Sequence, residues 1–259
     1  MAMGADRDPV TGFAAESARL APLETFDPAA FRESAEVPEE LCNFVLALAV
    51  VYNDFKDAIY AHVALADCKP QGQFRRTRAW GANVGARGHL IRIMMGMVHE
   101  LLELITKNQT QIEHQFFQSV VQRLGPKARD AWTALVNAAT ASQPRDPLAR
   151  RLLRFRNAVA FHYEPNAFGA GYKHHFDGVQ KSDEWAFVSR GATMRESRLY
   201  FADAAAIGYA RSVVGDPRID DLLREVAETV DRINRGLFLI VEAFIQRRGC
   251  AFRDYREEL

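Results

Sequence analysis

Apolar residues at helical spacing fill long stretches of this chain and constrain its fold more than any other feature. They recur at steps of three and four over residues 38–66, 90–105 and 222–244. Because an α-helix turns once every 3.6 residues, this spacing places apolar side chains along one face. Each stretch is therefore predicted to form a long amphipathic helix. The first contains Leu41, Phe44, Val45, Leu48, Val51, Tyr52, Phe55, Ile59 and Val63.

Shorter helices are expected between the long ones, at about residues 110–124, 127–141, 146–164 and 204–214. Residues 67–77 and 166–178 contain glycine and proline or adjacent histidines, and both are predicted to be loops. Residues 184–189 and 197–201 alternate in the manner of strands, with Gly191 between them, which indicates a small β-hairpin. The predicted fold is all-α, a helical bundle with long antiparallel helices and a minor β-hairpin near residues 184–201.

The domain organisation follows from where the periodicity begins. Residues 1–37 are rich in Ala, Asp, Glu and Pro and have weak periodicity, so we expect a partly irregular N-terminal arm. Residues 38–259 are expected to form a single helical domain with the hairpin inserted late. Glycines at 81, 85, 88 and 96 interrupt the second long helix, at a cost of about 1 kcal/mol each against alanine. Their presence suggests close helix packing instead.

Composition limits the classes of function. The chain holds 33 basic and 33 acidic residues, so any phosphate-binding surface must come from local clustering. Three cysteines, Cys42, Cys68 and Cys250, are far apart and form no CxxC pair, which argues against a disulfide framework and favours the cytoplasm. The most apolar segments, residues 44–51 and 237–245, are far shorter than the roughly 20 residues of a membrane span.

One segment carries residues suited to chemistry. Arg156 and Asn157 precede His162 near the end of the helix that opens at Asp146 and Pro147. Arginine can bind a phosphate through two parallel hydrogen bonds, and histidine exchanges protons near neutral pH. Such a pair could cut RNA without a metal. A histidine with aromatic neighbours at the end of a core helix is also compatible with a purely structural role.

The helical wheel separates the two side chains. At about 100° per residue, Arg156 and His162 lie on opposite sides of an apolar stripe. One straight helix therefore does not bring them together, whereas a second copy of the helix packed along the stripe would. We expect a homodimer formed through this helix. The stripe consists of Leu148, Leu152, Phe155 and Val159.

The run Arg156-Asn157-Ala-Val-Ala-Phe-His162 resembles the arginine, polar residue, spacer and histidine signature of the HEPN superfamily. The extended run through Tyr163 is similar to prokaryotic members related to toxins and abortive-infection proteins. The resemblance covers residues 145–165 and fits the helices from about residue 38 onward. It implies a metal-independent endoribonuclease, acting as a dimer with a composite active site, in a toxin or phage-defence role with a possible antitoxin partner.

The resemblance also implies roles for single residues. His162 would act as general acid or base for attack of a ribose 2′-hydroxyl on the adjacent phosphate, and Arg156 would stabilise the developing charge. Asn157 would orient the histidine or the phosphate. The products would be a 2′,3′-cyclic phosphate and a 5′-hydroxyl. Residues expected to contact the RNA are Arg151, Arg154, Tyr163, Lys173 and His174.

Two other classes of function stay open. A HEPN-like module could bind a nucleotide or a protein without catalysis. A helical metalloprotein needs Glu-x-x-His spacing on two helices, which the segments around His99 and His114 lack. The adjacent His174 and His175 have only Asp177 as a nearby acid, so a surface loop is the favoured interpretation there. No metal or cofactor is expected.

Overall fold

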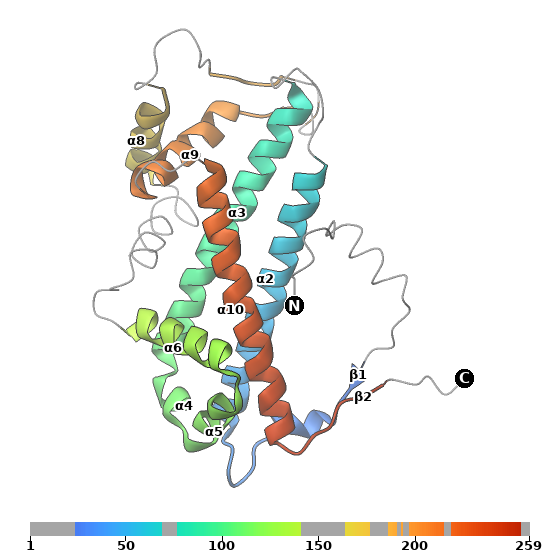
Figure 1. Cartoon of the computed structure of the whole chain (residues 1–259). Helices are drawn as coiled ribbons and strands as arrows, with labels where there is room; N and C mark the ends of the chain where they lie inside the picture. The colour runs from blue at the N-terminus through green and yellow to red at the C-terminus, as the bar shows by residue number, and fades with distance from the viewer. Residues whose placement is uncertain are drawn as a thin grey trace. The chain divides into compact units, whose positions relative to one another are not determined.

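The computed structural model describes residues 24–68, 77–140, 164–176, 186–190, 193, 197–214 and 219–254 (Figure 1). Helices account for 80% of these residues and strands for almost none, so the prediction of an all-α fold is confirmed. Within the same residues, no helix combines the length and the apolar character that crossing a membrane requires.

The long helices α2 (Glu39–Asp67), α3 (Arg78–Lys107) and α10 (Ile219–Arg247) coincide with the stretches of apolar periodicity. The remaining elements are β1 (Glu24–Thr25), the 3-10 helix η1 (Pro28–Phe31), α4 (Gln109–Glu113), α5 (Gln115–Arg123), α6 (Pro126–Thr140), α8 (Pro165–Phe176), α9 (Tyr200–Val214) and β2 (Arg253–Asp254).

The chain divides into two compact units, and each of them draws on separate stretches of sequence. Unit 1 consists of Met1–Ala64, Leu101–Thr140 and Asp231–Leu259. Unit 2 consists of Leu65–Glu100 and Ala141–Val230.

An aromatic cluster forms the core of unit 1. Phe117 of α5 packs edge-on against Phe44 of α2 and Trp132 of α6, at ring-centroid distances of 5.6 and 5.7 Å. Phe116 packs in the same way against Phe244 of α10, at 5.7 Å. Edge-to-face pairs of this kind stabilise a core beyond the effect of burial alone. The cluster therefore ties four helices of unit 1 together.

The segment that precedes α2 is held against the end of α10. Arg248 donates hydrogen bonds to the carbonyl oxygens of Ala30 and Arg32, at 3.1 and 2.6 Å, and to the Ser34 hydroxyl, at 2.8 Å. Phe31 stacks on Phe244, with ring centroids 5.5 Å apart. The short strands β1 and β2 pair antiparallel beside these contacts. Residues 24–37 thus contribute buried side chains to unit 1, among them Ala30 and Val37.

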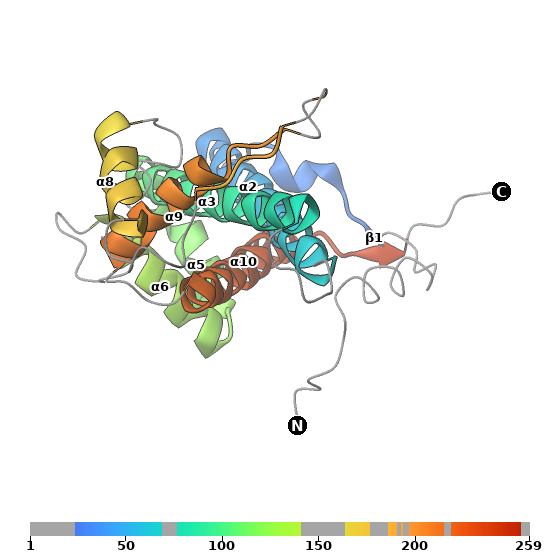
Figure 2. The ribbon, with the colours of Figure 1, turned by 90° about the horizontal axis from the view of Figure 1, so that it is seen from above.

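Unit 2 is built on the close crossing of α8 and α9, which lie side by side in Figure 2. A Cβ atom at Gly171 of α8 would overlap the carbonyl oxygen of Ala205 and lie 2.6 Å from the backbone nitrogen of Tyr209. A Cβ atom at Gly208 of α9 would overlap the carbonyl oxygen of Gly171. Only glycine allows the two backbones this approach.

The prediction of a loop over residues 166–178 is wrong, because α8 occupies residues 165–176. In the sequence, Pro165 favours the end of the preceding helix, because the residue before a proline disfavours helical geometry. Proline lacks an N–H and has a fixed φ, so it fits equally well in the first turn of a new helix. Gly171 lowers helix propensity locally, but the contact with α9 requires it.

Two further predictions need correction. The helix expected over residues 110–124 is broken at His114, whose backbone leaves the helical region (ψ 131°). Its Nδ1 accepts a hydrogen bond from the Phe116 N–H in the first turn of α5. The hairpin is reduced, within the described residues, to one antiparallel bridge between Ser189 and Arg198. Tyr200 and Phe201 belong to α9.

Candidate functional site

Most of the residues predicted to act in catalysis lie outside the described part of the chain. These are Arg156, Asn157 and His162, together with the substrate-contact candidates Arg151, Arg154 and Tyr163. The other two candidates, Lys173 and His174, are exposed on the last turn of α8. An α-helix rises about 1.5 Å per residue, so Lys173 lies about 12 Å along the α8 axis from Pro165, the first residue of the helix.

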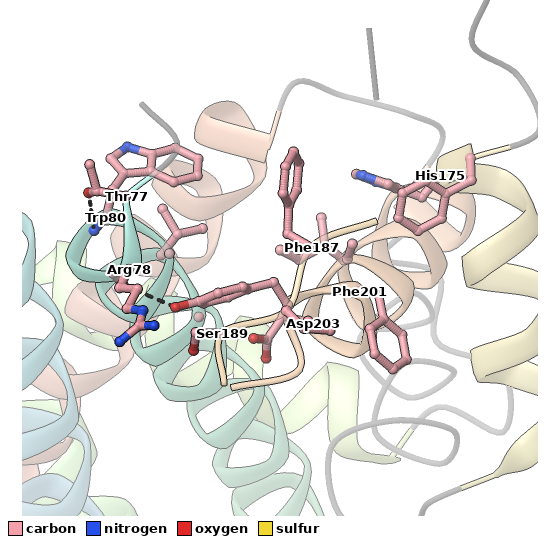
Figure 3. A pocket seen from close by; sticks show the side chains of 16 residues that line it. Thr77, Arg78, Trp80, His175, Phe187, Ser189, Phe201 and Asp203 are labelled. Atoms are coloured by element: carbon pink, nitrogen blue, oxygen red, sulfur yellow. Dashed lines mark hydrogen bonds between the residues drawn. The ribbon is translucent and has the colours of Figure 1, made fainter. Parts of the chain in front are cut away.

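A cavity of about 600 Å³ lies within unit 2. Its walls come from the first turns of α3, the end of α8, the segment 187–189 and the first turns of α9 (Figure 3). Aromatic rings dominate the apolar part of the lining, and each of these elements supplies at least one ring. They are Trp80, Phe176, Phe187, Tyr200 and Phe201.

Two glycines one turn apart on α3 shape one side of the cavity. A Cβ atom at Gly81 would lie 2.5 Å from Cε1 of Tyr200, and a Cβ atom at Gly85 would overlap the Arg198 guanidinium. Both side chains therefore lie against bare backbone on α3. The Tyr200 hydroxyl donates a hydrogen bond of 3.1 Å to the Arg78 carbonyl oxygen, which fixes the ring against the helix. The glycines at these positions therefore admit two side chains from the segment 198–200 against α3, whereas the sequence suggested close packing between helices.

The start of α3 is held by side-chain hydrogen bonds. The Thr77 hydroxyl accepts a hydrogen bond from the Trp80 N–H at 3.2 Å, which satisfies one of the unpaired donors of the first turn. The Arg78 guanidinium donates a hydrogen bond of 3.1 Å to the Arg190 carbonyl oxygen. These two bonds position the polar residues at the α3 side of the cavity.

The charged side chains Arg78 and Asp203 line the cavity. Arg198 binds Asp203 through two hydrogen bonds, of 2.8 and 3.2 Å, the bidentate geometry that suits a guanidinium and a carboxylate. Asp203 lines the cavity, and its charge is balanced by this pair. Nearby, partial desolvation and the positive charges of Arg92 and Arg198 lower the pKa of His89 below its usual value.

The arrangement suits binding of a flat, largely apolar molecule with polar edges. Ser189, which is buried, and Thr77 add hydroxyl groups to the lining, and His175 adds a half-buried imidazole. Across the described ranges, no three His, Cys, Asp or Glu side chains gather in a way that could hold a metal ion.

Sequence reasoning missed this cavity. Residues 77–85 were assigned to a loop and an interrupted helix, and residues 184–201 to a hairpin. The available signal was the i, i+4 pair Gly81 and Gly85 together with four aromatic residues between positions 185 and 201.

Comparison of the chain with models of known protein families, with curated proteins and with solved structures finds no significant match.

Proposed function

We propose that this chain is a metal-independent endoribonuclease of the HEPN type. The observation that carries the proposal is the sequence Arg156-Asn157-x4-His162, placed in a chain whose described part is all-α. This residue set supplies a phosphate ligand, a proton-transfer group and a polar group that can orient either of them. A toxin or phage-defence effector, with an antitoxin as a possible partner, is the biological role that the resemblance favours.

In the proposed reaction, His162 removes the proton from a ribose 2′-hydroxyl, which attacks the adjacent phosphorus. Arg156 donates hydrogen bonds to the phosphate oxygens as negative charge develops on them. The bond to the 5′-oxygen breaks, and that oxygen takes a proton. The products are a 2′,3′-cyclic phosphate and a 5′-hydroxyl. No metal or cofactor takes part, and two copies of the chain share one composite site.

The substrate-contact residues Arg151, Arg154, Tyr163, Lys173 and His174 are proposed to hold the RNA backbone beside this site. The two of them that the structure describes are exposed on the last turn of α8, where cationic side chains can reach a phosphate.

The experiment compares wild-type chain with Arg156→Ala and His162→Ala on total cellular RNA in the presence of EDTA, followed by mapping of the fragment ends. Each substitution is expected to reduce cleavage by at least about a hundredfold, in the range of a lost acid–base group. Lys127→Ala removes an exposed cation on α6 and is the matched control for a general loss of charge. Cleavage that survives in both variants refutes the proposal.

The alternative, a non-catalytic HEPN-like module that binds a nucleotide or a protein, predicts no cleavage by wild type under any of these conditions. Circular dichroism of each variant shows whether the fold is intact. Size-exclusion chromatography with light scattering tests the expected homodimer.

A further inference from the structure

The cavity of unit 2 has the size of a small-molecule site. Its volume of about 600 Å³ falls within the range of about 300–1,000 Å³ typical of such sites. Its lining is mainly apolar, with few polar groups, which is the usual composition of a pocket that binds and orients one ligand.

The aromatic lining favours a flat ring as the ligand. Trp80 comes from α3, Phe176 from α8, Phe187 from the segment before α9, and Phe201 from α9. In the view of Figure 3, Phe187 lies between Trp80 and His175, with Asp203 below them. Aromatic side chains on several sides of one cavity provide faces on which a planar ring can stack, and nucleobases bind in this way without regard to sequence.

The polar groups suit the edges of such a ring. The Asp203 carboxylate can accept hydrogen bonds from exocyclic amino groups, and the hydroxyl groups of Ser189 and Thr77 can donate or accept. The ion pair with Arg198 holds the carboxylate in place, so little conformational freedom is lost when a ligand binds.

A cation lies where an attached phosphate could be bound. Arg78 lines the cavity and its residue is exposed. Its guanidinium has five N–H donors, and one of its amino groups donates to the Arg190 carbonyl oxygen, so the remaining donors can bind an anion. Aromatic faces, an orienting carboxylate and an exposed guanidinium together match the chemistry of a nucleotide.

We propose that this cavity binds an unpaired nucleobase bearing a phosphate, either as a free mononucleotide or as one unit of a single-stranded RNA. The described residues of the cavity carry this proposal, which does not rest on the proposed ribonuclease activity.

The test measures binding to the full chain by titration calorimetry. The probes are the four nucleoside 5′-monophosphates, ribose 5-phosphate, and a single-stranded octamer of 2′-O-methyl RNA, which cannot be cut by 2′-hydroxyl attack. We expect at least one monophosphate to bind in the micromolar to millimolar range and ribose 5-phosphate to bind at least about tenfold more weakly, because it has no base to stack.

Ala204→Trp fills the cavity from α9 and is expected to weaken binding of the monophosphate at least about tenfold, the scale of one lost stacking contact. Ala202→Trp places the same side chain on the exposed side of the same helix and should leave binding unchanged. If Ala204→Trp unfolds the chain, Phe187→Ala is the second variant, because Phe187 is exposed and its loss creates no core void.

Displacement of the monophosphate by the octamer identifies single-stranded RNA as the source of the base, and failure to displace it identifies a free nucleotide. The proposal is overturned if no monophosphate binds wild type up to millimolar concentration, or if folded Ala204→Trp or Phe187→Ala binds as wild type does. Loss of RNA cleavage in His162→Ala with unchanged binding, or the reverse, separates this proposal from the ribonuclease activity.

Discussion

The crossing of α8 and α9 predicts opposite effects for two alanine substitutions that lie two residues apart on α8. Gly171→Ala places a methyl group against the backbone of Ala205 and Tyr209. Gly169→Ala places the same group at an exposed position with no atom within 4 Å. Both changes remove the same conformational freedom from the unfolded chain, so their difference isolates the contact between the helices.

The expected change in the free energy of unfolding is the sum of two opposing contributions. Alanine in place of glycine within a helix stabilises by about 1 kcal/mol, and this gain applies at both positions. At Gly171 the added methyl group meets backbone atoms, which cannot rotate away, so the two helices must separate at a cost of about 3 kcal/mol, the upper end for overpacking. The free energy of unfolding is therefore expected to rise by about 1 kcal/mol in Gly169→Ala and to fall by about 2 kcal/mol in Gly171→Ala.

Urea and thermal unfolding, followed by circular dichroism, measure both variants. A difference of about 3 kcal/mol corresponds to about 6–12 °C in Tm for a chain of this size. Gly208→Ala provides an independent check, because its methyl group would overlap the Gly171 carbonyl oxygen from the other helix. Equal stability of Gly169→Ala and Gly171→Ala would refute the close crossing.

Three further predictions concern other parts of the chain. Arg248→Lys should cost about 1–2 kcal/mol in urea unfolding and speed proteolysis within residues 24–37, because an ammonium cannot reproduce the forked hydrogen bonds; unchanged proteolysis would contradict this. Gly236→Ala in α10, with no atom within 4 Å of its Cβ, should raise stability by up to about 1 kcal/mol, and a lower Tm would count against it. Because the pKa of His89 is lowered in the folded chain, the unfolded state binds more protons, and stability falls as pH drops below about 6.5. His89→Gln should therefore lose less Tm than wild type between pH 7 and pH 5, and an identical loss would exclude the effect.

The long helices could be predicted from the sequence because the residues that are buried in the structure are the same residues that form the apolar pattern. The apolar spacing over residues 38–66 predicts α2 to within one residue at each end, and its members Leu41, Phe44, Leu48 and Phe55 are buried. On α3, Met94 and Met95 are each 1% exposed. The apolar pattern at such positions predicts the helix directly, since one face of a helix must be apolar to pack against its neighbours.

The errors fall where a distant contact outweighs local preference. Gly169 and Gly171 lower the helix propensity of residues 165–176, and the contact with α9 stabilises that helix nonetheless. The backbone of His114 ends α4 and its imidazole caps α5, a role that spacing alone does not reveal. The cavity is assembled from four short stretches that each contribute one or two rings, so the glycine pair and the aromatic residues that indicate it lie far apart in the sequence.

The hydrogen bonds between Arg248 and residues 29–34 join parts of the chain that the ribosome synthesises at very different times. Arg248 and Ala30 are 218 residues apart, so at about 5–20 residues per second Arg248 is added about 10–40 s after Ala30. Until then the ring of Phe31 has no Phe244 to stack on, and Phe116 lacks the same partner. A chain that stops before α10 is complete therefore presents uncovered aromatic side chains, the kind of surface that chaperones and proteases recognise. A finished chain covers these aromatic side chains within unit 1, whereas a truncated chain leaves them exposed.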